Sequence, residues 1–125
     1  MKLLLDTHAL LWWLTDDPHL SYRAEAGISN PDNDVFVSAC AGYEIAYKQK
    51  LGRLPPLPES LPRRLRREGM EILPISMDHA LAAAALRGPH RDPWDRIMMA
   101  QAMAERCQVV TVDAVFSDYG VPVLW

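Results

Sequence analysis

Short apolar runs that alternate with helical patterns are the feature that most limits how this chain can fold. The first run, KLLL at residues 2–5, is followed directly by an acid. Comparable runs stand at residues 34–38, 71–75, 108–112 and 121–124. A continuous apolar run of this length is typical of a strand that is buried on both faces. The sequence therefore predicts about four to five strands at the centre of the molecule.

The segments between these runs have helical patterns. Helices are expected at residues 7–14, 21–29, 39–51, 61–68, 77–86 and 93–106. Parallel strands need long crossover connections, and helices usually supply them. We therefore expect an α/β fold whose mainly parallel central sheet is flanked by helices. With 125 residues, of which 50% are hydrophobic, the chain can bury one core, so residues 1–125 are expected to form a single domain.

Neither the cysteines nor the N-terminus point to secretion. Cys40 and Cys107 lie far apart in apolar stretches, so buried, reduced thiols are expected. The apolar N-terminal run is interrupted by Asp6 and His8, and no later stretch approaches the roughly 18 apolar residues of a membrane span. We expect a cytoplasmic protein with no membrane contact.

Four acids lie just after expected strands or in the first two turns of expected helices. Asp6 follows the first expected strand and Asp113 follows the fourth. Glu44 lies about one and a half turns into the helix after the second strand, and Asp95 lies in the first turn of the helix that Pro93 opens. Open parallel sheets bind ligands outside the carboxyl ends of their strands. We therefore expect these four carboxylates to converge at one edge of the sheet.

Each acid also has a purely structural alternative. Asp6 could cap a helix, Asp113 could be a turn residue, and Glu44 could pair with Lys48. Asp95 could complete the cap of its own helix. Taken together these alternatives are weaker, because two carboxylates about 4 Å apart repel by roughly 4 kcal/mol at an effective dielectric constant near 20. A bound cation removes that repulsion. A site made only of oxygen ligands favours Mg²⁺ or Mn²⁺ over Zn²⁺ and suits phosphodiester hydrolysis.

The segments around these acids resemble the PIN domain family, and in particular its VapC-type toxins. The matching pieces are LLLDTHALLWWL, SACAGYEIAYKQKLGRL, HRDPWDRIMMAQAMAE and VVTVDAVFSDYGVPVLW, which together cover most of the chain. The resemblance implies a three-layer, PIN-like fold. It also implies that the catalytic, metal-holding acids are Asp6, Glu44, Asp95 and Asp113. Thr7 is similar to a group that orients water or substrate, with helix capping as the alternative.

The resemblance further implies an endoribonuclease that depends on Mg²⁺ or Mn²⁺ and forms the toxin half of a type II toxin–antitoxin pair. A water activated at the metal would attack phosphorus and leave 5′-phosphate and 3′-hydroxyl ends. The implied partners are a VapB-like antitoxin, a structured RNA such as tRNA or rRNA, and a second copy in a homodimer. An apolar groove for the antitoxin is expected on the hairpin of residues 39–68, through Tyr43, Tyr47, Leu51 and Leu65, with core packing as the alternative.

The formal net charge of −3 does not favour RNA binding by itself, but cations at the acids would offset it. Basic residues crowd into the middle of the chain. A group on one expected helix is a candidate for phosphate contact, with a solvated helix face as the alternative: Arg63, Arg64, Arg66 and Arg67. We interpret Asp92 as a helix cap and Asp118 as a surface acid, with direct metal contact as the alternative for both.

Two other functions are compatible with parts of the pattern. In a non-catalytic, PIN-like binding module the acids would be structural. A phosphoacceptor receiver domain also has an acidic pocket at its strand ends, but it needs a lysine late in the chain. Here Lys50 is the last lysine, which argues against a receiver domain.

Overall fold

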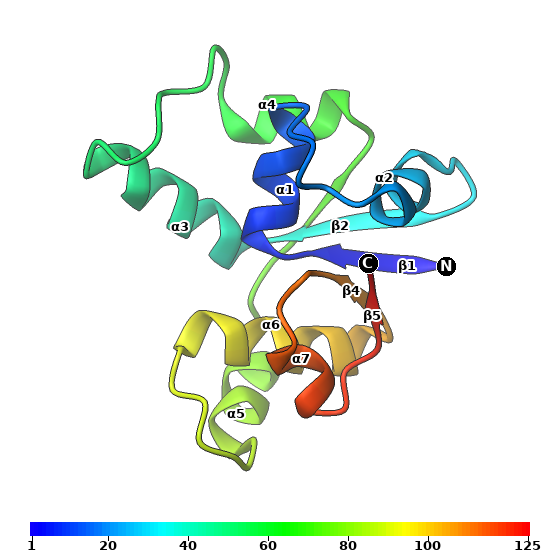
Figure 1. Ribbon diagram of the computed structural model, residues 1–125. Coiled ribbons are helices and arrows are strands. Elements are labelled where there is room, and N and C mark those ends of the chain that lie inside the picture. The colour runs from blue at the N-terminus through cyan, green and yellow to red at the C-terminus, as the bar shows by residue number, and fades with distance from the viewer.

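The computed structural model describes residues 1–125 as a five-stranded sheet between two layers of helices (Figure 1). The strands are β1 (Lys2–Leu5), β2 (Asp34–Ser38), β3 (Glu71–Leu73), β4 (Gln108–Val110) and β5 (Val123–Leu124). Their order in the sheet is β3-β2-β1-β4-β5, and every neighbouring pair is parallel. This confirms the predicted α/β fold with a parallel central sheet.

The helices divide between the two faces of the sheet. One layer holds α1 (Thr7–Leu14), α2 (Tyr22–Ser29), α3 (Ala39–Lys50) and α4 (Leu61–Arg67). The other holds α5 (Met77–Ala85), α6 (Pro93–Glu105) and α7 (Val115–Asp118), as Figure 1 shows below the sheet. These helices supply the crossovers that return the chain to the starting end of the next parallel strand.

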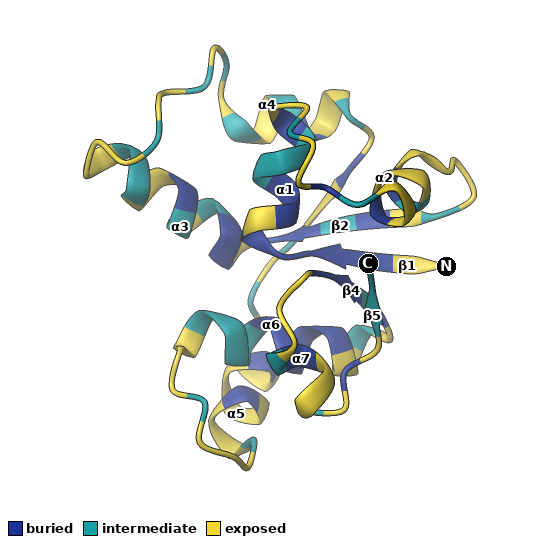
Figure 2. Cartoon of the chain, viewed as in Figure 1, coloured by how far each residue is buried: buried dark blue, intermediate teal, exposed yellow.

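The central strand β1 supplies both halves of the core. Leu3 and Leu5 pack with α1 to α4, whereas Leu4 packs on the opposite face with Met98 and Phe116. The alternation follows from the period of two in a strand. All three leucines are fully buried, and the buried colour in Figure 2 runs along β1 and β2. The KLLL run therefore lies inside the molecule, as its composition predicts.

Two strands are shorter than their apolar runs. β3 ends before Pro74, which has no N–H to donate to a ladder. β4 ends at Val110, because the backbone N–H of Asp113 donates to Thr111 Oγ1 (2.9 Å) and turns the chain out of the sheet. Asp113 therefore lies beyond the end of its strand. The short helix α7 was not predicted.

No helix combines the length and the apolar character needed to cross a bilayer. The two cysteines are buried and free, as expected. Burial raises the pKa of the Cys40 thiol to about 11, so the thiol stays protonated at neutral pH.

Candidate active site

Asp6 is a buried carboxylate at the junction of β1 and α1. Its Oδ1 accepts a hydrogen bond from the backbone N–H of Ala9 (2.7 Å), which makes Asp6 the N-cap of α1. Its Oδ2 accepts from the hydroxyl of Thr111, 105 residues away in sequence. The capping alternative is thus correct, and the same side chain is also held by the loop after β4. Both contacts fix the carboxylate at the carboxyl edge of the sheet.

Glu44 points from α3 toward the first turn of α1. Thr7 Oγ1 donates to Glu44 Oε1 at 2.9 Å, and the threonine is only 3% exposed. Thr7 therefore orients an acid and does not cap the helix. Burial raises the pKa of Glu44, against the opposing effects of the Thr7 hydrogen bond and the positive charge of Lys48. No ion pair forms between Glu44 and Lys48.

Asp95 lies in the first turn of α6 and is held by a histidine that the sequence did not indicate. His90 Nε2 lies 2.8 Å from Asp95 Oδ2. Asp92 caps the helix by accepting from the backbone N–H groups of Trp94 and Asp95, so its predicted capping role is confirmed. The one sequence feature that could have indicated His90 is its position just before the start of α6, from which a side chain can reach the first turn of the helix.

Asp113 is exposed on the turn after β4, two residues before α7. Its Oδ1 accepts from the backbone N–H of Val115 (3.0 Å). Thr111 connects this turn to the buried acid, because its hydroxyl donates to Asp6 and accepts from the Asp113 N–H. One threonine therefore sets the position of two of the four acids.

Three of the four acids have a raised pKa, to which neighbouring acids contribute. Burial is the main cause that raises the pKa of Asp6, and the negative charge of Asp113 adds to it. Burial likewise raises the pKa of Asp95, with further increases from Asp92 and Asp113. The charge of Asp95 in turn raises the pKa of Glu44. Such mutual repulsion at a sheet edge marks a candidate functional site.

The acids are not, however, arranged as a ready-made set of metal ligands. No three acidic, histidine or cysteine side chains are placed to hold one ion together. Three of the predicted ligands have a carboxylate oxygen engaged by a side chain of the protein, namely Asp6 by Thr111, Glu44 by Thr7 and Asp95 by His90. The structure thus brings the four acids to one edge, and hydrogen bonds set their orientation there.

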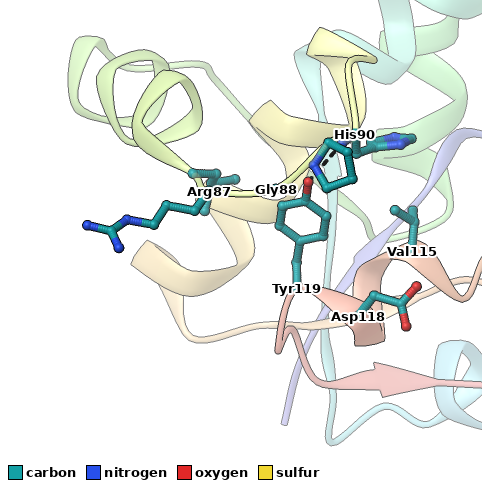
Figure 3. Close-up of a pocket in the computed structure, with 8 residues that line it drawn as sticks. Arg87, Gly88, His90, Val115, Asp118 and Tyr119 are labelled. Atoms are coloured by element: carbon teal, nitrogen blue, oxygen red, sulfur yellow. Dashed lines mark hydrogen bonds between the residues drawn. The ribbon is translucent and has the colours of Figure 1, made fainter.

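A hollow of about 640 Å³ lies between the loop from α5 to α6 and α7 (Figure 3), and His90, the partner of Asp95, lines it. The Tyr119 hydroxyl accepts a hydrogen bond from the backbone N–H of His90 (3.0 Å). Gly88 has a φ of +124°, and any Cβ there would collide with the ring of Tyr119. Arg96 also holds this loop, by donating to the backbone carbonyls of Ala83 (3.1 Å) and His90 (3.0 Å). The loop that carries His90 to Asp95 is therefore held from both sides.

The predicted phosphate contacts are at the far end of α1. Arg64 forms an ion pair with Glu68 (2.8 Å) and donates to the carbonyl of Leu14, the last residue of α1. Arg67 forms an ion pair with Glu59. Asp6 caps the opposite end of this eight-residue helix, about 12 Å away along the axis. The two remaining arginines are exposed and form no ion pair: Arg63 and Arg66.

An apolar groove of about 340 Å³ runs between α3 and α4. We call it the α3–α4 groove, and its lining includes Ala39, Gly42, Ala46, Leu61, Leu65 and Ile72. Leu65 thus lies at the groove, as expected, but it is only 2% exposed. Tyr43, Tyr47 and Leu51 do not line it. The tyrosines follow a different stripe of α3 from Gly42 and Ala46.

Comparison with known proteins gives the chain its family. The PIN domain profile matches residues 3–122. The chain is 27% identical over 113 residues to "Ribonuclease VapC22" of Mycobacterium tuberculosis, which covers 88% of this chain and 85% of that protein.

Solved structures share the fold. VapBC2 from Rickettsia felis, bound to a promoter DNA fragment, has a TM-score of 0.69 at 16% identity and covers 98% of this chain and 96% of its own. A toxin–antitoxin complex from Klebsiella pneumoniae has a TM-score of 0.60 at 22% identity, covering 89% and 86%. Since the profile matches almost the whole length, the chain belongs to the PIN domain family.

Proposed function

We propose that this chain is an endoribonuclease that depends on Mg²⁺ or Mn²⁺ and acts as the toxin of a type II toxin–antitoxin pair. The observation that carries the proposal is the placement of four carboxylates from four separate segments near the carboxyl edge of the sheet, where burial and neighbouring acids raise the pKa values of Asp6, Glu44 and Asp95. The relative named as a ribonuclease, which matches most of the chain, supports the same activity.

The donor chemistry suits a hard cation, because every candidate ligand is a carboxylate oxygen. Three of the four acids have a raised pKa, and a divalent cation among them would offset the repulsion that contributes to this rise. We propose that Asp6, Glu44 and Asp95 are the main ligands and that Asp113 completes the site. Because no three of them are placed as a ligand set, binding must draw them closer together.

The residues of the chain have separate tasks in this proposal. A bound Mg²⁺ or Mn²⁺ would activate water and offset charge on the phosphate. Asp6 is held by Ala9 and Thr111 and is therefore the fixed point of the site. Thr7 holds one oxygen of Glu44, which leaves the other oxygen for a ligand. His90 does the same for Asp95.

The proposed partners are an antitoxin, a structured RNA and a second copy of the chain. A solved neighbour is itself a toxin–antitoxin complex, which supports a protein inhibitor for this chain. An apolar helix of such an inhibitor would lie in the α3–α4 groove, which small side chains of α3 leave open.

The proposal is tested by incubating the purified chain with a structured RNA in Mg²⁺, in Mn²⁺ and in a chelator. We expect cleavage only with metal, and 5′-phosphate ends on the products. The control is Asp118→Asn, which removes an exposed acid outside the proposed ligand set. If neither metal supports cleavage and neither raises the melting temperature, the non-catalytic binding module becomes the better description.

A further inference from the structure

We propose that three aromatic side chains beside the acids form a base-stacking platform for unpaired nucleotides of an RNA. The three residues are Trp94, Tyr43 and Tyr47, and we call them the aromatic row. The proposal deepens the ribonuclease assignment, on which it rests, by naming a surface for the substrate next to the scissile phosphate.

The three rings form a continuous series. Tyr43 lies between the other two, with ring centroids 4.9 Å from Trp94 and 5.8 Å from Tyr47. The two tyrosine rings are stacked with an interplanar angle of 19°. Tyr43 and Tyr47 are one helical turn apart on α3, so the series follows the helix axis.

The tyrosines are far more exposed than large side chains in a core. Tyr43 is 52% exposed and Tyr47 is 49% exposed. Trp94, in contrast, is half-buried and packs against the core. The ring surfaces of the two tyrosines that face solvent are available to a ligand, and every nucleobase has a π-face that can stack on them. A core packing role accounts for Leu65 on the neighbouring helix, which is buried, but not for these two tyrosines.

The row stands directly beside the proposed ligands. Tyr43 precedes Glu44 in α3, and Trp94 precedes Asp95 in α6. The contact between Tyr43 and Trp94 therefore joins the two helices next to the two acids that they carry. A strand whose phosphate reaches the acids has its next bases within reach of these rings.

The charges near the row fit the nucleotide backbone. Lys50 lies seven residues after Tyr43 and three after Tyr47, on the same stripe of α3. Lys48 lies one turn after Glu44, and its positive charge opposes the rise in the pKa of that acid. Aromatic rings that stand beside cations are how single-stranded nucleic acids are bound without strong sequence preference. The row therefore favours an unpaired loop over a duplex, whose bases are already stacked.

The occupant that competes with RNA is a protein, either the antitoxin or a second copy of the chain. Small residues on an adjacent stripe of α3 line the α3–α4 groove and already provide an apolar seat for a helix. The charges beside the row, two lysines and two acids that would hold metal, match a phosphodiester chain better than an apolar helix.

The test measures binding of a single-stranded RNA oligonucleotide that carries 2-aminopurine, whose fluorescence falls on stacking. All proteins carry Asp6→Asn, so that the probe is not cut. Tyr43→Ala with Tyr47→Ala should weaken binding by about tenfold for each base that loses its ring, and should remove the fluorescence change. Tyr43→Phe with Tyr47→Phe keeps the rings and should bind as the parent does.

Two controls make the result specific. Tyr22→Ala removes a tyrosine that is 87% exposed on α2, away from α3 in Figure 1, and should change nothing. An RNA with abasic positions should bind weakly to the parent and no more weakly to the alanine pair. Equal binding by the alanine pair and the parent would overturn the platform. The platform would also be overturned if the alanine pair changed the oligomeric state, measured by sedimentation, or the antitoxin affinity while RNA binding stayed intact. The row would then be a protein interface.

The outcome separates this inference from the ribonuclease assignment. Cleavage by the otherwise unaltered chain, with a KM that the alanine pair leaves unchanged, would retain the enzyme and reject the platform. Ring-dependent quenching in a chain that no metal makes active would retain the platform and reject the enzyme.

Discussion

Thr7 Oγ1 lies 2.9 Å from Glu44 Oε1 and joins the first turn of α1 to α3 across 37 residues of sequence. We predict that Thr7→Val, which keeps the shape but removes the hydroxyl, lowers kcat/KM for RNA cleavage about tenfold or more, because a hydrogen bond to a charged group contributes about 1.5–3 kcal/mol. Thr7→Ser should keep most of the activity. Cleavage rates on one RNA check this, and equal rates for the valine and serine variants would contradict it.

Asp6→Asn should abolish cleavage without unfolding the chain. Asparagine is as good an N-cap as aspartate, so α1 keeps its cap, and a buried carboxylate with a raised pKa is removed. The melting temperature without metal should therefore hold or rise. Calorimetry beside an activity assay measures both, and a clear drop in melting temperature with activity retained would mean that the cap is the main role of Asp6.

The stabilising effect of metal should depend on pH. Burial raises the pKa values of Asp6 and Asp95 above the ordinary 3.8, and that of Glu44 above 4.5. The folded chain therefore binds more protons than the unfolded chain in the window above these ordinary values, and metal-free stability falls as pH rises through that window. Metal needs the ionised form. The increase in melting temperature with Mn²⁺ should be largest at neutral pH. It should disappear when the pH falls below the ordinary pKa values of the carboxyl groups.

Of the four arginines of α4, two should bind RNA and two should stabilise the fold. Replacing Arg63 and Arg66 with serine should flatten the salt dependence of RNA binding by about one unit for each lost phosphate contact. Replacing Arg64 and Arg67 should mainly lower stability, because these two form ion pairs with Glu68 and Glu59. Binding titrations over a series of salt concentrations decide the matter. If replacing Arg63 and Arg66 left the salt dependence of RNA binding unchanged, these arginines would belong to a solvated helix face.

An antitoxin tail with a basic residue should compete with metal for the acids. By linkage, saturating Mn²⁺ should weaken the tail as much as the tail weakens Mn²⁺. Calorimetric titration of the tail peptide with and without Mn²⁺ measures the coupling. Full inhibition by a tail that lacks its basic residue would show that filling the α3–α4 groove is sufficient.

The sequence predicted the elements better than their ends. Runs such as KLLL and DVFVS became β1 and β2 with the expected bounds, because complete burial leaves a continuous apolar signature. The order of the strands was not predictable, since it depends on which helices cover which face. The end of β4 was missed because the turn after it is set by one hydroxyl, that of Thr111.

Of the groups that hold the four candidate acids, the sequence indicated Thr7 but not His90. The acids themselves were recognisable because they lie just after strands or in the first two turns of helices, within family-like segments: Asp6, Glu44, Asp95 and Asp113. The contacts that orient them join residues far apart in sequence, as Thr111 and Asp6 do, and no local pattern encodes such a pair. The aromatic row likewise depends on how α3 crosses α6.

The central place of β1 has a consequence for how the protein is made. Asp6 is synthesised long before Gln108, where β4 starts, yet the strand that precedes Asp6 pairs with β4. Until the ribosome has released that late segment, β1 has an open edge and Asp6 has no Thr111 to hold it. Contacts between distant parts of a chain also form slowly. A nascent chain therefore has no complete acidic centre until the segment that carries Thr111 and Asp113 has left the ribosome.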